Sequence, residues 1–347
     1  ARAFNRQPLY VRAAVLFCGP FANLIVAVLI LCIVFGTAGY STTVIAQTGE
    51  KMPAQEAGLE KGDRIVSFDG KRVYHPNDIQ LFMVANKDKP AEIEFIRDNV
   101  KRTTVLIPEK IPAQKRYLLG FVPKEPDGVD STLVESVMSE SNAARAGLMV
   151  GDRIIELNGT PVSERQQINE FMERNQDAPV KVTILRNGQE QVLTIEPVLS
   201  ETSEDYNLGM AFETKRSGVF ETIGAALGYT VSTVRSVYFG LLWLITGMVS
   251  VSQMMGPVGI VSTIGSVVSQ SPSFSLLVLN LLYFTAFISI NLGVMNLIPF
   301  PALDGSKLLL ILVEAVRKKA IPPEKEAVIS LVGFVVLIMF MIFTTFN

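Results

Sequence analysis

Three stretches of the 347-residue chain carry no charged side chain, and they limit the possible folds more than any other feature. They are residues 13–35, 236–303 and 327–347. A helix of about 20 apolar residues crosses a hydrocarbon core roughly 30 Å thick, so each stretch is long enough to span a membrane. Residues 41–216 are instead polar, with turn residues and short alternating segments. The order is therefore membrane, soluble insert, membrane, which predicts a multi-pass α-helical membrane protein.

Charge and cysteine content exclude two other classes of protein. The net charge of −2 gives no electrostatic argument for nucleic acid as a partner. Both cysteines, Cys18 and Cys32, lie in the first apolar stretch, and the soluble insert has none. A disulfide framework is therefore excluded for the insert.

Basic residues flank the apolar stretches on two sides. Arg2, Arg6 and Arg12 precede the first stretch. A second cluster between Asp304 and the last stretch comprises Lys307, Arg317, Lys318, Lys319 and Lys325. The positive-inside rule places both clusters in the cytoplasm. The first span then runs outward, the insert is extracytoplasmic, and the segment that begins near Phe274 runs back inward.

This orientation leaves no place for a further full span at residues 218–247. That segment also carries Glu221 and Arg235 and is interrupted by Gly, Ser and Thr. We predict an amphipathic helix that lies at the outer membrane surface. The alternative is a fourth full span with reversed topology of the C-terminal part.

The soluble insert contains a repeat with a constant offset of 89 residues. Residues 57–70 recur as 146–159, with eight of fourteen positions identical. In each copy a Gly-Asp-Arg-Ile sequence opens a strand, and Asp-Gly or Asn-Gly follows as a tight turn. The predicted strands are 65–68, 154–157, 180–185 and 191–195, and helical spacing predicts helices over 77–85 and 164–174.

The repeated pattern resembles the bacterial PDZ domain, Ala-Gly-Leu-x-x-Gly-Asp-x-Ile-x-x-x-Asn-Gly. The fold class that this implies is a multi-pass membrane protein with two inserted PDZ-like domains, α+β and β-rich. PDZ domains commonly bind extended peptide termini by adding a strand to a sheet edge. The two domains are therefore expected to contact extracytoplasmic protein termini. The alternative is a pair of spacer domains with empty grooves, and the sequence does not locate the grooves.

Asp304 closes the longest uncharged stretch, within Asn-Leu-Ile-Pro-Phe-Pro-Ala-Leu-Asp-Gly at residues 296–305. A carboxylate at this place costs about a few kcal/mol unless it is paired or binds a cation. Pro299 and Pro301 break the helix just before it, and bent backbone at membrane depth is tolerated only inside protein or beside a cavity. These features predict a polar site within the membrane.

Membrane segments around tandem PDZ-like domains, together with this aspartate motif, resemble the site-2 protease family. The similarity is greatest to bacterial regulator-of-sigma-E (RseP-type) intramembrane metalloproteases. Gly19-Pro20-x-x-Asn23, residues 256–260 and Asn291-Leu292-Gly293 add further matches. The domains expected from this resemblance are a transmembrane segment (1–40), two PDZ-like domains (41–113 and 114–200), an amphipathic membrane-surface region with a Gly-Pro loop (201–270) and two C-terminal transmembrane segments (271–347).

The resemblance implies a zinc endopeptidase that cleaves single-span membrane proteins in the bacterial inner membrane. Its substrates would be anti-sigma factors already trimmed outside, or remnant signal peptides. Asp304 would be the third Zn²⁺ ligand, beside two histidines of a His-Glu-x-x-His helix. Asn296 and, less directly, Asn291 would bind the substrate backbone. Pro299, Pro301 and Gly305 would shape the motif. Whether the PDZ pair filters substrates by size or binds a gating ligand is left open.

The chain departs from the family in its histidine content. Its single histidine, His75, lies in the first PDZ-like repeat and is expected on the surface or in a loop. No His-Glu-x-x-His can be written from these residues. We therefore expect an upstream portion to carry that helix, and the chain alone to be inactive. The alternative is a non-catalytic, membrane-anchored PDZ receptor or scaffold. A small transporter with Asp304 as an ion site leaves the repeat unexplained.

Overall fold

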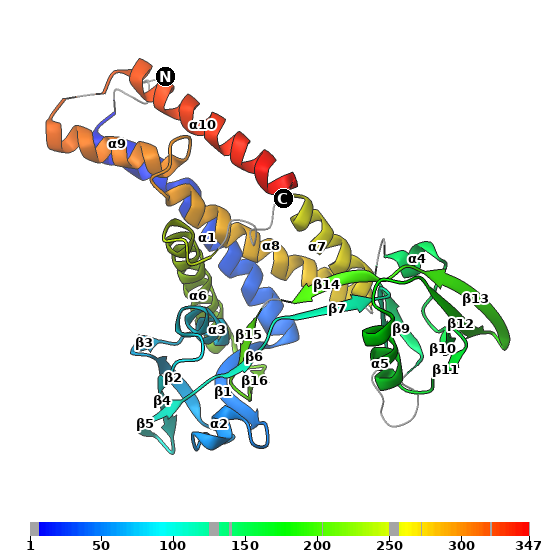
Figure 1. Ribbon diagram of the computed structural model, residues 1–347. Coiled ribbons are helices and arrows are strands. Elements are labelled where there is room, and N and C mark those ends of the chain that lie inside the picture. Colours follow the sequence, from blue (N-terminus) through cyan, green and yellow to red (C-terminus); the bar gives the residue numbers. More distant parts are fainter. Residues whose placement is uncertain are drawn as a thin grey trace. The chain divides into compact units, whose positions relative to one another are not determined.

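The computed structural model describes residues 7–124, 132–138, 141–202, 204–249, 257–271, 273–319 and 321–346. The chain divides into two compact units (Figure 1). The first comprises Ala1–Glu109, Tyr206–Thr263 and Pro272–Asn347, and the second comprises Lys110–Asp205 and Ile264–Ser271. The second unit is thus inserted, along the chain, into the first.

Three helices in the described part are long and apolar enough to cross a membrane. They are α1 (Leu9–Ala38), α8 (Phe274–Leu297) and α10 (Pro323–Phe346), which agree with the predicted spans. The other long helices are α6 (Val219–Ile245), α7 (Pro257–Gln270) and α9 (Asp304–Arg317). Helix α6 is not one of the three candidate spans, and its position at the membrane surface stays a prediction.

Helices α1 and α8 pack closely through small residues. A Cβ atom added at Gly293 would lie 2.9 Å from the Pro20 carbonyl oxygen. The hydroxyl of Ser289 donates a hydrogen bond of 2.8 Å to the Asn23 carbonyl. Small residues and hydroxyl bonds of this kind hold helices together where the solvent is lipid. The Gly-Pro-x-x-Asn and Asn-Leu-Gly segments therefore meet at one helix crossing.

The first PDZ-like domain belongs to the first unit and is built around helix α3 (Pro76–Asn86). Its strands and short helix are β1 (Tyr40–Thr48), α2 (Pro53–Glu56), β2 (Arg64–Phe68), β3 (Lys71–Arg72), β4 (Ala91–Arg97), β5 (Val100–Leu106) and β16 (Met210–Lys215). The sheet order is β16-β1-β2-β4-β5, with β3 paired to β2. Strand β16 follows the second PDZ-like domain along the chain, so the first domain's sheet extends beyond the segment 41–113 expected from sequence.

The second PDZ-like domain repeats this arrangement around helix α5 (Arg165–Asn175). Its other elements are β7 (Gln114–Leu118), β8 (Phe121–Pro123), β9 (Val134–Val137), α4 (Asn142–Arg145), β10 (Arg153–Leu157), β11 (Thr160–Pro161), β12 (Val180–Arg186), β13 (Gln189–Ile195) and β14 (Val198–Thr202). Strands β6 (Glu109–Ile111) and β15 (Asp205–Asn207) lie where the chain passes between the units. The predicted strands and helices of both copies are confirmed to within a few residues.

Helix α6 contacts the first PDZ-like domain through Arg235. Its guanidinium donates a hydrogen bond of 2.6 Å to the Arg72 carbonyl and lies 4.8 Å from the centre of the Phe82 ring. The buried carboxylate of Asp78 is 3.5 Å away. The Arg235 charge, which argued against a membrane span at α6, therefore contacts polar and aromatic groups of the first PDZ-like domain.

The repeat preserves two structural devices. The turn residues Asp69 and Asn158 have positive φ angles of 49° and 47°, as the Asp-Gly and Asn-Gly turns require. A buried aspartate in each copy also forms an ion pair with an arginine of the neighbouring strand. In the second copy, Arg186 Nε and Asp152 Oδ1 are 2.7 Å apart, and Arg186 also donates to the Gly147 carbonyl.

Replacing Asp152 with asparagine is expected to destabilise the second domain by about 1.5–3 kcal/mol, a typical value for hydrogen bonds to a charged group. Burial would raise the pKa of Asp152, but hydrogen bonds from Arg186 and the Met149 N–H lower it below its usual value. A carboxyl group whose pKa is lowered on folding stabilises the protein above its unfolded pKa, about 3.9, and loses this effect as pH falls through the folded value.

The difference between wild type and Asp152→Asn should therefore be full at pH 7 and shrink below about pH 4. Hydrogen exchange of β10–β13 in the intact protein, corrected for the intrinsic pH dependence of exchange, measures this difference. An exposed carboxylate, Glu190→Gln, serves as the control. A destabilisation that stayed constant from pH 7 to pH 3 would contradict the assigned role of the charge.

Candidate functional site

The helix break before Asp304 is the first candidate site. Helix α8 ends at Leu297 and α9 begins at Asp304, as the two prolines predict. Between them Ala302 has a φ angle of 84°, in the left-handed region that residues with a Cβ rarely adopt. A residue held in this region stores about 1–3 kcal/mol and is common at functional loops. The loop is thus fixed by its surroundings in a strained form.

Gly305 explains how the break is closed. A Cβ added at Gly305 would overlap the carbonyl oxygens of Leu297 and Ile298, and one added at Gly333 of α10 would overlap the Pro301 carbonyl. The first turn of α9 therefore lies directly against the end of α8. Asn296 and Asp304 each stand one residue from this contact, so the fold brings them to one corner of the membrane part. The predicted shaping role of Gly305 has a clear steric basis.

The side chains at this corner differ in their hydrogen bonding. Within the described residues, the Asp304 carboxylate and the Asn296 amide have no hydrogen-bond or ion-pair partner, and both are half-buried. The Asn291 amide instead donates a hydrogen bond of 2.7 Å to the Phe287 carbonyl within α8. Two unpartnered polar groups in an apolar helix bundle are costly unless a ligand satisfies them.

The described residues contain no group of three or more His, Cys, Asp or Glu side chains that could hold a metal ion. The sole histidine, His75, caps the N-terminus of α3 by accepting a hydrogen bond of 3.2 Å from Asn77 N–H. It is half-buried, and its ring lies 5.1 Å from that of Tyr229 in α6. Burial lowers the pKa of His75 to about 4, so it is neutral near pH 7. The loop position was predicted, whereas the contact with α6 was not.

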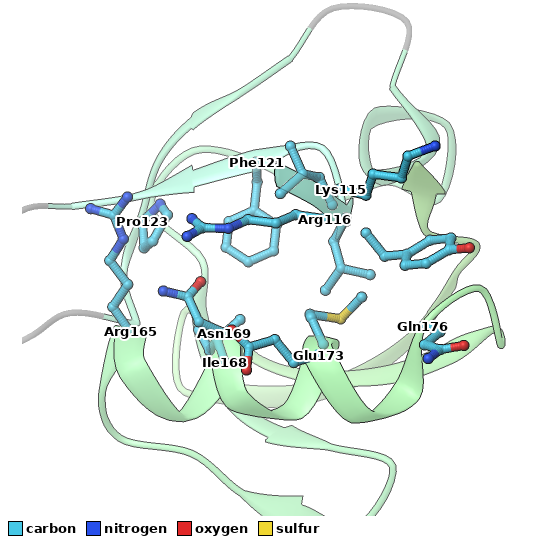
Figure 2. Close-up of a pocket in the computed structure, with 13 residues that line it drawn as sticks. Lys115, Arg116, Phe121, Pro123, Arg165, Ile168, Asn169, Glu173 and Gln176 are labelled. Carbon is cyan, nitrogen blue, oxygen red and sulfur yellow. The ribbon is translucent and has the colours of Figure 1, made fainter. Parts of the chain in front are cut away.

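A groove in the second PDZ-like domain is the second candidate site, and sequence reasoning did not locate it. It encloses a cavity of about 290 Å³ between α5 and the segment 115–123. Helix α5 lines it at helical spacing with Arg165, Ile168, Asn169, Met172, Glu173 and Gln176 (Figure 2). The facing segment contributes Lys115, Arg116, Tyr117, Leu118, Leu119, Phe121 and Pro123. Strand β8 pairs only with β9 in the described sheet, which leaves its other edge open beside α5.

The loop between β7 and β8 offers backbone donors to this groove. The N–H groups of Leu119 and Gly120 donate no hydrogen bond to any described residue. In the first domain the equivalent Gly209 N–H donates a hydrogen bond of 2.8 Å to the side-chain oxygen of Asn207. An anion such as a terminal carboxylate therefore finds two open donors in the second domain, whereas in the described part of the first domain the Gly209 N–H is bonded internally and only the Leu208 N–H is open.

The 89-residue offset of the repeat could have located the loop between β7 and β8 from the sequence. Tyr117-Leu118-Leu119-Gly120-Phe121 and Tyr206-Asn207-Leu208-Gly209-Met210 are again 89 residues apart. Three of the five positions are identical. The second of these segments leads into β16, which pairs with β1. The offset therefore also indicates that residues after the second domain complete the first.

In the described part of the chain, three candidate spanning helices, two PDZ-like domains and a carboxylate without a partner at a helix break define a multi-pass membrane protein with a polar site in its helical part. The chain belongs to Peptidase family M50, whose sequence model matches residues 1–340. The predicted site-2 protease membership is thereby confirmed.

Two bacterial relatives illustrate the similarity. A Vibrio cholerae protein named as a zinc metalloprotease is 28% identical over 374 aligned positions, which cover 100% of this chain and 80% of that protein. The zinc metalloprotease RasP of Oceanobacillus iheyensis is 31% identical over 66% of this chain and 54% of its own length. The chain thus aligns with about half the length of that RasP protein.

Solved structures similar to parts of the chain include a PDZ domain and an HtrA-type protease. The HtrA3 PDZ domain bound to a phage-derived ligand is 21% identical, covers 26% of this chain and 91% of that domain, and has a TM-score of 0.22. The HtrA-type protease AlgW with a decapeptide is also 21% identical and has a TM-score of 0.23, with 31% of this chain and 42% of that protein covered.

Proposed function

We propose that the chain forms most of an intramembrane zinc endopeptidase that cleaves single-span membrane proteins, with Asp304 as a zinc ligand. The observation that carries the proposal is the Asp304 carboxylate at the break between α8 and α9, which has no partner among the described residues, in a chain of Peptidase family M50. A hard, negatively charged oxygen at the start of a helix is a suitable ligand for Zn²⁺.

The chain's residues fit zinc as one ligand of a larger set. Asp304 supplies an oxygen ligand, but the only histidine, His75, is held in the first PDZ-like domain by Asn77 and Tyr229. These 347 residues contain no His-Glu-x-x-His, so they would supply only the aspartate ligand of the zinc site, and we expect them to be inactive alone. When bound, zinc supplies the Lewis acid for peptide hydrolysis.

The described residues around Asp304 would position the substrate. The free amide of Asn296 can donate to a carbonyl and accept from an N–H of an extended substrate backbone. Asn291 would serve the same purpose after its intrahelical bond to Phe287 is exchanged. The Gly305 contact with Leu297 and Ile298 keeps Asn296 and Asp304 in a fixed relation.

The PDZ-like domains would present the substrate terminus. The open donors of Leu119 and Gly120, beside the unpaired edge of β8, suit an extended peptide with a free carboxylate. This supports substrates whose outer domain has already been removed, such as trimmed anti-sigma factors or remnant signal peptides. The basic clusters support a location in the bacterial inner membrane with both domains outside the cytoplasm.

A chelation experiment on the full-length gene product tests the proposal. We expect detergent-purified protein to cleave a single-span reporter, to stop after zinc is removed with a chelator, and to recover when zinc is restored. Cleavage that persisted in zinc-free protein would refute the proposal. The alternative, a non-catalytic PDZ receptor, is favoured by the single histidine and expects neither zinc nor cleavage while peptide binding is retained.

A further inference from the structure

We propose that the groove of the second PDZ-like domain selects peptide C-termini with an acidic side chain about two residues before a hydrophobic last residue. The inference rests on the proposed function of this groove as a site for peptide termini. It adds the charge preference of the ligand, which depends on Arg116 and Arg165.

The direction of the peptide follows from the two ends of the groove. Figure 2 places Arg165 and Pro123 at one end and Lys115 and Gln176 at the other. The open N–H groups of Leu119 and Gly120 immediately precede β8, so a terminal carboxylate bound there leaves the peptide running along β8 toward Pro123. Leu119, Ile168 and Met172 belong to one buried apolar cluster and would receive the last side chain.

The spacing then brings a second side chain to the arginines. Side chains of a strand point to the same face every second residue, and two residues advance about 6.6 Å. From Met172 to Arg165, α5 advances seven residues, which is about 10 Å. A side chain two residues before the last one therefore faces Asn169 and reaches toward Arg165. Arg116 extends across the groove toward the same end (Figure 2).

The charges at this place favour an acid. Among the residues that the structure describes, the groove is lined by the basic side chains of Lys115, Arg116 and Arg165 and by the acidic side chain of Glu173. Glu173 lies two helical turns beyond Arg165, nearer to Gln176. A guanidinium binds a carboxylate with two parallel hydrogen bonds, which adds geometric selectivity to the charge. A lysine at the same peptide position would face two like charges.

The first PDZ-like domain provides an internal contrast. At the equivalent positions, 89 residues away, Pro76 replaces Arg165, and Asp205 and Glu204 replace Arg116 and Lys115. Its loop donor Gly209 N–H is also bonded to Asn207. The first domain therefore lacks one of the two open donors and the basic end, and binding of an acidic terminus to the intact chain should report mainly the second groove.

Fluorescence anisotropy with the full chain in a non-ionic detergent tests the preference. The probes are labelled decapeptides that end in valine and differ only two positions earlier, with Glu, Gln or Lys. We expect Glu to bind about five- to tenfold more tightly than Lys, with Gln between them, which is the scale of partly exposed ion pairs. Arg165→Gln should reduce this ratio, and adding Arg116→Gln should bring it close to one.

Arg174→Gln is the matched control, because Arg174 is exposed on α5 and does not line the groove. It should leave the Glu-to-Lys ratio unchanged. Equal binding of the three peptides, with affinity still lost on amidation of the C-terminus, would overturn the charge preference alone. Binding that ignored amidation, or no binding at all, would instead refute the groove as a site for free termini.

Discussion

Asp304→Asn in the full-length protein is expected to lower intramembrane cleavage by at least about a hundredfold and to weaken zinc retention. Partners that only orient metal ligands already change affinity or activity by about 10–100-fold, so loss of a direct ligand should reach the upper end or exceed it. Asparagine keeps the size of the side chain and removes its charge. The unpartnered carboxylate loses no hydrogen bond within the described residues, so the helix break should survive the change.

Two measurements separate loss of the ligand from loss of the fold. Elemental analysis gives zinc per chain, and the rate of reporter cleavage gives activity, in wild type, Asp304→Asn and Asp88→Asn. Asp88 is an exposed carboxylate after α3 and should behave like wild type. Unchanged zinc content and cleavage in Asp304→Asn would remove Asp304 from the metal site, whatever the family membership of the chain.

Local sequence patterns predicted the elements of the fold well. The turns at Asp69 and Asn158 follow from residues that tolerate positive φ, and the strands and helices beside them follow from period and turn position. The spans follow from length and apolar composition. The break before Asp304 follows from Pro299 and Pro301, since proline lacks the N–H that a helix interior needs. Each of these depends on neighbouring residues only.

Long-range pairing could not be predicted in the same way. Strand β16 joins β1 by pairs such as Tyr40 with Lys215, and the whole second PDZ-like domain lies between them along the chain. The 89-residue offset also relates residues 117–121 to 206–210 and so indicates that β16 belongs to the first domain. Only three of these five positions are identical, however, which makes the relation easy to miss. Likewise, the groove charges depend on which face of α5 meets β7 and β8, and helical spacing alone does not choose the facing strand.

The candidate site shows the same division. Sequence identified Asp304 and Asn296, and packing supplied the reason that they meet, through the contact of Gly305 with the end of α8. Sequence also assigned Arg12 to a cytoplasmic basic cluster. The structure shows that Arg12 Nη1 is 2.6 Å from Glu314 Oε2, on α9, with both side chains buried. No local pattern joins residues 302 positions apart.

Glu314→Ala is expected to destabilise the membrane part by about 3–5 kcal/mol, because it leaves the buried Arg12 guanidinium without this carboxylate. The Glu314 carboxylate also accepts a hydrogen bond of 2.8 Å from Ile321 N–H, just before α10. The Glu314 side chain thus links α9 to α1 and to the segment just before α10. Unfolding by titration with SDS in mixed micelles measures the loss, and Arg317→Gln, an exposed charge on α9, is the control.

The double variant Arg12→Met/Glu314→Leu distinguishes a structural ion pair from a mere sum of two residues. Replacing both charges with apolar groups removes the uncompensated charge, so the double variant should be more stable than Glu314→Ala. In the full-length protein its cleavage activity should also be higher than that of Glu314→Ala. Helix α9 carries Asp304 at its other end, so a better packed α9 holds that residue in place. A double variant as unstable as the sum of both single changes would show that Arg12 and Glu314 act independently.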